Sequence, residues 1–388
     1  MNNKNSILFA SNFFSNLCFF SMLAILALYF SVNCKFSASF SGVLMFFVVL
    51  SSRAGRIILL PFLKEYETKT SLLISAILMS LGYFVLYLSK IKGLMFIAFF
   101  ILGVGYGCNS VYVRSLIAIS ANTKTNKLSY VNLSVVTNLS AAIGALLAVC
   151  VFTKISGEYV FLYSSILMLI SACIIYALYD HEEIQISTMR MLQALLFILR
   201  TPGVSRIFIL TILSWIMCIQ LFSVLPLLIN NQLAATSFLG SLYAINTLII
   251  VLLSVPINKY LLKFDIDANA FIMIGFLFIG SGFILLYLMP MLLTAYLSVI
   301  LWTVGEILII PSLNSSLSEL TKGSERLHVF AFNGVAIGFG EGIGMYLGAT
   351  LAELQPTSQI SHIYLYLSWI ALFFVGVVFI FKGIKYEN

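Results

Sequence analysis

The sequence predicts an all-α integral membrane protein in which twelve transmembrane helices form two pseudo-symmetric bundles of six. Hydrophobic residues make up 61% of the 388-residue chain and charged residues only 9%, far below the roughly 25% of a soluble domain. The apolar residues form uninterrupted runs of about 20, which is the length that lets a helix cross a bilayer. Because a helix satisfies its backbone hydrogen bonds internally, such runs favour a helical bundle over a membrane barrel.

An internal repeat relates the two halves of the chain. A stretch in the first half aligns without a gap to a stretch 200 positions later in the second half. Glycines match near both ends of this register. Chance similarity between apolar helices does not readily produce such a match. Many membrane transporters are built from repeats of this kind. The matched pairs include Gly105 with Gly305, Ser115 with Ser315, and Gly144 with Gly344.

The first bundle is assigned to residues 1–180, where six apolar runs alternate with short polar turns. The N-terminus passes from Lys4 directly into the first run, which favours a retained helix over a cleaved signal peptide. A polar break, DHEEIQISTMR, follows the sixth run. The predicted spans are 7–30, 40–63, 71–88, 94–120, 128–152 and 159–179.

Residues 181–203 are expected to form a cytoplasmic linker. Its apolar run at 191–199 is too short to cross a bilayer, so we expect a short helix lying along the membrane interface. The second bundle is assigned to residues 204–388. Its predicted spans are 204–229, 237–262, 270–288, 291–320, 329–351 and 363–381.

The distribution of Lys and Arg predicts that both termini are cytoplasmic in the cell (inner) membrane. With that orientation, the outer loops hold only Lys35, Lys90, Lys92 and Lys154, and most other basic residues lie inside. The net charge of +7 follows from this dispersed arrangement, so it gives no indication of nucleic-acid binding. We expect a monomer surrounded by the lipid bilayer.

Twelve spans, two related halves, a charged linker and cytoplasmic termini together resemble the major facilitator superfamily. The GVGYG segment at 103–107 is similar to the glycine-rich fourth helix of that superfamily, and WTVGEILIIPSLN at 302–314 to the tenth helix of its drug-efflux-like, proton-antiporter members. NLSAAIGALL at 138–147 is similar to the antiporter motif, although Ala145 replaces its proline. The loop after the second helix, PFLKEYETK at 61–69, lacks the glycine and aspartate of the family pattern.

Five charged residues lie within predicted spans and away from their ends, where each costs at least about 2.5–3.5 kcal/mol and calls for a reason. These are Arg53, Arg56, Arg114, Glu306 and Glu341. The resemblance implies that the fourth and tenth helices line a central cavity, which places Arg114 and Glu306 beside the solute path. Since withdrawal from water favours a protonated carboxyl group, we expect Glu306 and Glu341 to carry protons. We expect Arg114 to bind an anionic group of the solute. The alternative for Arg114 is an anchor at the inner surface.

Uncharged polar residues on the predicted spans are candidates for hydrogen-bonding the solute. Interhelical hydrogen bonding is the alternative for each of them. Asn12 and Asn16 lie one turn apart on the first helix and therefore share a face. The full set is Asn12, Asn16, Asn109, Asn138, Gln220, Asn246 and Asn314.

A gate is predicted between the second and eleventh helices, which the resemblance implies are packed against each other across the seam between halves. Arg53 and Arg56 are three residues apart and so lie on one face. Counting 1.5 Å per residue from the cytoplasmic ends of the two helices places Arg53 about 15 Å and Glu341 about 18 Å deep, a difference within the reach of an arginine side chain. We therefore expect an Arg53–Glu341 or Arg56–Glu341 contact that forms when the cytoplasmic side closes.

Together these features predict a secondary transporter that works by alternating access. The favoured activity is proton-coupled export of a small organic solute that is anionic or amphipathic. The alternatives are uptake or export of a specific metabolite such as a siderophore or sugar, and a membrane-embedded enzyme or sensor. The chain shows no nucleophile–base pair, no metal-ligand spacing and no phosphate-binding loop, so we expect neither enzymatic activity nor a bound cofactor or metal.

Overall fold

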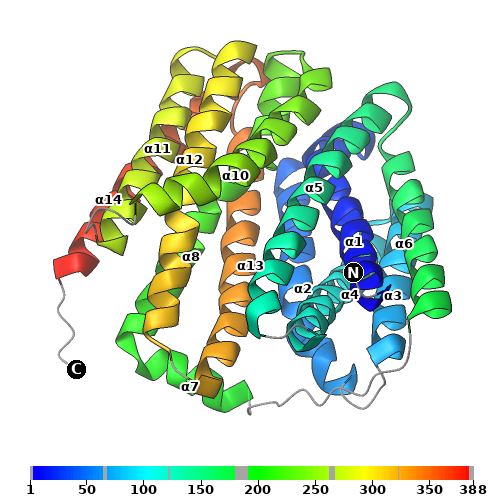
Figure 1. Ribbon diagram of the computed structural model, residues 1–388. Coiled ribbons are helices and arrows are strands. Elements are labelled where there is room, and N and C mark those ends of the chain that lie inside the picture. Colours follow the sequence, from blue (N-terminus) through cyan, green and yellow to red (C-terminus); the bar gives the residue numbers. More distant parts are fainter. Residues whose placement is uncertain are drawn as a thin grey trace. The chain divides into compact units, whose positions relative to one another are not determined.

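The computed structural model describes residues 3–63, 68–120, 123–179, 191–261, 267–321 and 323–383, and these residues fold as helices (Figure 1). Twelve helical segments among them are long and apolar enough to cross a membrane. This confirms the predicted all-α fold with twelve spans. The segments follow the predicted order along the chain, and their ends shift by a few residues.

The contacts divide the chain into two units, Met1–Ile186 with Leu239–Thr247 (unit 1) and Ser187–Phe238 with Leu248–Asn388 (unit 2). In unit 1, α1 packs against α4, α5 and α6, and α4 also packs against α2 and α3. The first and fourth helices therefore each pack against several others in this unit. Its elements are α1 (Asn3–Leu28), a π-helical turn η1 (Tyr29–Asn33), α2 (Ala38–Leu63), α3 (Thr68–Leu88), α4 (Lys92–Ser120), α5 (Thr123–Lys154) and α6 (Glu158–Leu178).

Unit 2 repeats this plan after a short helix, α7 (Met191–Arg200), which occupies the apolar run of the predicted linker. The main contacts are α8 with α13, and α11 with both α12 and α14. Its elements are α8 (Pro202–Cys218), η2 (Ile219–Leu221), α9 (Val224–Leu227), η3 (Leu228–Gln232), η4 (Thr236–Phe238), α10 (Leu239–Leu261), α11 (Ala268–Leu288), α12 (Leu292–Glu319), α13 (Gly323–Glu353), η5 (Thr357–Gln359) and α14 (His362–Gly383). The first part of α10, up to Thr247, belongs to unit 1.

The sequence repeat corresponds to a repeat in packing. A Cβ added to Gly105 would lie 2.8 Å from the Ser75 carbonyl oxygen on α3, and one added to Gly305 would lie 2.5 Å from the Gly275 carbonyl oxygen on α11. Both glycines therefore let two helices approach so closely that no side chain fits between them. The spacing of 200 positions holds for these contacts as it does for the sequence.

The first helix of each unit ends in the same way. A π-helical turn, η1 or η3, closes each one, and the chain then passes through a residue with positive φ, Lys35 at 52° and Ala234 at 50°. A positive φ is uncommon for a residue other than glycine. Its recurrence at matching places shows that the two units share backbone detail as well as helix order.

The first helices of the two units differ in continuity. Whereas α1 is continuous, α8 stops at Cys218, passes through the 3₁₀ turn η2, and resumes as α9 at Val224. Pro226 explains the break, because proline lacks an N–H and its ring clashes with the carbonyl four residues earlier. Pro256 and Pro311, by contrast, lie inside the continuous helices α10 and α12.

Candidate functional site

Unit 1 contains a buried network of uncharged polar side chains that starts on α1. Ser11, Asn12 and Asn16 are at most 4% exposed. The Asn16 Nδ2 group donates to the backbone oxygen of Asn12 at 2.7 Å and to its Oδ1 at 3.0 Å. The spacing of four residues places the two amides on one face of the helix, as the sequence predicted.

Side chains from α4 and α5 complete this network. Tyr106 Oη donates to Oδ1 of Asn16 at 2.9 Å, and Asn109 Nδ2 donates to Oγ of Ser11 at 2.9 Å. From α5, Thr137 Oγ1 accepts a bond of 2.9 Å from Nδ2 of Asn12. The predicted residues Asn12 and Asn16 thus share one set of bonds, Asn109 bonds separately to Ser11, and both sets tie α1 to neighbouring helices. We call Ser11, Asn12, Asn16, Tyr106, Asn109 and Thr137 the amide network.

An aromatic pair adjoins the amide network. The rings of Phe19 and Tyr106 stack with centroids 4.0 Å apart and planes 9° from parallel. Both side chains are buried. Tyr106 therefore links a planar apolar surface to the amides through its hydroxyl group.

Sequence reasoning did not single out Tyr106 or Thr137. A signal for Tyr106 was present, since it lies three residues before Asn109 and hence on the same face of α4. Thr137 directly precedes Asn138, the residue that the sequence did select on α5. Adjacent residues do not share a helix face, so Asn138 gave no signal for Thr137, whereas the spacing of three residues did so for Tyr106.

Unit 2 contains two carboxyl groups near the middle of its spans. Glu306 is partly exposed in the middle of α12, and Glu341 on α13 is 5% exposed. The buried thiol Cys218, where α8 ends, is within electrostatic range of both carboxyl groups. The two predicted proton-carrying residues thus lie in the same unit as this cysteine, which the sequence did not mark.

Gln220 lies in the break of α8 and ties this helix to α13. Its Nε2 group donates to the backbone oxygens of Ile216 at 2.8 Å and Gly344 at 2.9 Å. The corresponding glycine in unit 1, Gly144, accepts a bond of 2.9 Å from Ser21 of α1. For the amide nitrogen of Gln220, interhelical bonding is thus the role that the structure shows.

The other predicted site residues are distributed as follows. Arg53 on α2, Asn138 on α5 and Asn246 on α10 are partly exposed, and Asn314 on α12 is exposed. The side chains of Arg56 and Arg114 lie outside the described part of the structure. The predicted contact between Glu341 and Arg53 or Arg56 would join the two units and stays a prediction.

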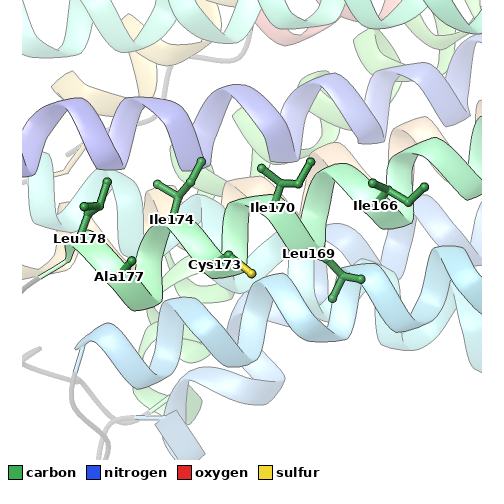
Figure 2. Close-up of a pocket in the computed structure, with 7 residues that line it drawn as sticks. All are labelled: Ile166, Leu169, Ile170, Cys173, Ile174, Ala177 and Leu178. Carbon is green, nitrogen blue, oxygen red and sulfur yellow. The ribbon is translucent and has the colours of Figure 1, made fainter.

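A shallow groove on α6 has a lining unsuited to a polar solute. Figure 2 shows its side chains in two rows along the helix, and all seven are apolar or cysteine. Ile166, Leu169 and Leu178 are at least half exposed. On a membrane span, such a surface is typical of contact with lipid tails. The lining residues are Ile166, Leu169, Ile170, Cys173, Ile174, Ala177 and Leu178.

Comparison with known proteins gives a family and a fold. A profile of the Major Facilitator Superfamily matches residues 7–345. The chain is similar to a crystal structure of the peptide transporter POT in complex with sulfate, with a TM-score of 0.77, 16% identity, and coverage of 97% of this chain and 94% of the other. Comparison with curated protein sequences gives no match.

Two further solved structures are similar. One is a POT family transporter in complex with 5-aminolevulinic acid, with a TM-score of 0.76, 17% identity, and coverage of 97% and 95%. The other is a mutant of the nucleoside transporter NupG, with a TM-score of 0.79, 13% identity, and coverage of 97% and 98%. At these identities the likeness is one of fold.

Proposed function

Because the chain belongs to the major facilitator superfamily, we propose that this multi-pass membrane transporter exports a small organic solute in exchange for protons by alternating access. Membership of the superfamily supports transport of a small solute as the activity. Proton coupling, direction and the class of solute are the proposed part, and each is supported by particular residues.

The acidic pair in unit 2 is the observation that carries proton coupling. Glu306 and Glu341 are carboxyl groups near mid-span on α12 and α13, and both are within electrostatic range of Cys218 at the end of α8. A carboxyl group inside a membrane needs a functional reason, and its protonated form is favoured whenever water is withdrawn from it. A change in hydration during the transport cycle would therefore load and release a proton at this place.

The amide network of unit 1 supports recognition of the solute by hydrogen bonds. All its members are uncharged, and they come from α1, α4 and α5. Arg114 lies on the same helix as Tyr106 and Asn109 and is proposed to bind an anionic group, since guanidinium pairs well with carboxylate. The solute is thus proposed to be amphipathic or anionic and to carry hydrogen-bonding groups.

Export is proposed from the similarity of the tenth helix to that of efflux members. In the structure that segment, WTVGEILIIPSLN, lies within α12 and carries both Glu306 and Pro311. The acidic residue that we assign to proton coupling is therefore part of the motif that suggests efflux.

Inverted membrane vesicles containing the chain test this proposal. We expect at least one labelled solute from a panel of alanyl-alanine, 5-aminolevulinic acid, uridine, benzoate and ethidium to accumulate when the vesicle lumen is acidified, and a protonophore to abolish the accumulation. Equilibration that the protonophore leaves unchanged would contradict proton coupling. Accumulation in right-side-out vesicles alone would contradict export.

A further inference from the structure

We propose that Asn109 is a solute-binding residue whose side-chain oxygen accepts a hydrogen bond from an amide N–H or a hydroxyl group of the transported molecule. This inference rests on the proposed transport function and specifies the chemistry of its solute. Asn109 is fully buried, at 0% exposure, near the middle of α4. Its Nδ2 group donates to Ser11, whereas Oδ1 receives no hydrogen bond from any described residue.

An acceptor left in this state is unusual in a folded protein. Most buried polar atoms have a partner, and an unpaired one forfeits its hydration without compensation. The other amides of the network show what pairing is available here, since Oδ1 of Asn16 accepts from Tyr106. Oδ1 of Asn109 could therefore accept a hydrogen bond, and no described residue donates one.

The second repeat shows that helix packing does not require an amide at this position. In the register of 200 positions, Asn109 corresponds to Ile309, which is fully buried in α12 and packs against Gly275 of α11. An apolar side chain thus serves the same place in unit 2. The amide of Asn109 is accordingly assigned to recognition.

The surroundings select the chemistry of the donor. The described neighbours that bond to one another here are hydroxyl and amide groups from Ser11, Asn12, Asn16 and Thr137 together with the Tyr106 phenol. A formal positive charge placed among them would be buried without a counter-ion, which is costly. A neutral donor meets no such penalty, so Asn109 is matched to an amide N–H or a hydroxyl group.

Matched pairs of probes test this on the full-length chain in detergent micelles. Binding is measured by thermal shift for uridine against 3-methyluridine, and for N-acetylalaninamide against its N,N-dimethylamide. Methylation of uridine removes one neutral N–H donor, and dimethylation of the amide removes both of its N–H donors; the rest of each molecule is kept. We expect the donor-bearing member of at least one pair to bind the parent protein about tenfold more tightly than its methylated counterpart, which is the net effect expected of one hydrogen bond.

The variants Asn109→Ala and Asn109→Leu should remove that difference, and two are used so that one folding failure does not end the test. Ser171→Ala is the matched control, because Ser171 is a buried unpaired hydroxyl on α6, away from the network; it should keep the tenfold preference. The proposal is overturned if neither donor-bearing probe binds, if methylation costs no affinity, or if the Asn109 variants keep the preference. Since binding needs no gradient, it holds or fails independently of proton coupling.

Discussion

Tyr106 and Glu306 occupy the same position in the two structural repeats. Each follows a glycine, Gly105 or Gly305, that lets α4 approach α3 or α12 approach α11 closely. In unit 1 the position holds a phenol bonded to Asn16, and in unit 2 it holds a carboxyl group near Cys218. One repeat thus presents neutral hydrogen bonding where the other presents a group that can titrate.

Removing the Tyr106 hydroxyl group should weaken the amide network and leave the ring stacking in place. Tyr106→Phe leaves Oδ1 of Asn16 without its donor, so we expect a loss of about 0.5–1.5 kcal/mol in stability. Tyr106→Leu also loses the stacking on Phe19, worth about 0.5–1.5 kcal/mol more. Melting temperatures in micelles measure both. Equal melting of the parent and Tyr106→Leu would show that neither contact matters.

The glycine contacts between the first and fifth helices of each unit should be intolerant of a methyl group. A Cβ on Gly144 would overlap the Leu17 carbonyl oxygen, and one on Gly344 would lie 2.7 Å from that of Ile216. Both obstacles are backbone atoms that cannot rotate away, so Gly144→Ala and Gly344→Ala should each cost about 1–3 kcal/mol or more.

Gly93→Ala is the control for these substitutions, because nothing lies within 4 Å of its added Cβ and alanine favours a helix. Fluorescence-detected gel filtration after heating compares the three variants. Melting of Gly144→Ala at the temperature of Gly93→Ala would show that the helices separate readily at this contact.

Cys34 offers a test of the predicted orientation. It follows η1 and is partly exposed, and burial raises the pKa of its thiol above the ordinary value although Tyr29 and Lys90 act to lower it. If the N-terminus is cytoplasmic, a membrane-impermeant maleimide should label Cys34 on intact cells. Because the pKa is raised, less thiolate is present at neutral pH and labelling should accelerate as the pH rises. Cys34→Ser should lose the signal, and labelling that requires permeabilised cells would reverse the topology.

The predicted gate can be tested by exchanging charges. Arg53→Glu and Glu341→Arg should each impair transport, because each leaves like charges at the predicted contact. The double variant should recover part of the activity if the two residues pair in one state of the cycle. If the double variant transports no faster than the less active single variant, each residue has its partner within its own unit.

The sequence predicted the helices of this protein well, because a bilayer leaves little choice. Long apolar runs must become helices, and the break before Pro226 follows from the geometry of proline. The sequence repeat of 200 positions also predicted that Gly105 and Gly305 occupy equivalent positions, and both allow a close approach of two helices. These features depend on local chemistry alone.

The site was predicted in part. Asn12, Asn16, Asn109, Glu306 and Glu341 were selected because polar groups are rare inside a membrane. The bonding partners Tyr106 and Thr137 were missed because hydrogen bonds between helices depend on how each helix is rotated about its axis. That rotation is set by packing against neighbours, which no single helix sequence specifies.

The central claim is that Glu306 couples solute movement to protons, and flux in proteoliposomes tests it most directly. Glu306→Gln is compared with the parent chain and with Glu319→Gln, a control at the exposed end of the same helix. For the panel solute that the parent transports, we expect Glu306→Gln to abolish accumulation driven by a pH gradient while keeping exchange of labelled for unlabelled solute, and Glu319→Gln to retain both. Accumulation by Glu306→Gln at the parent level would contradict the account.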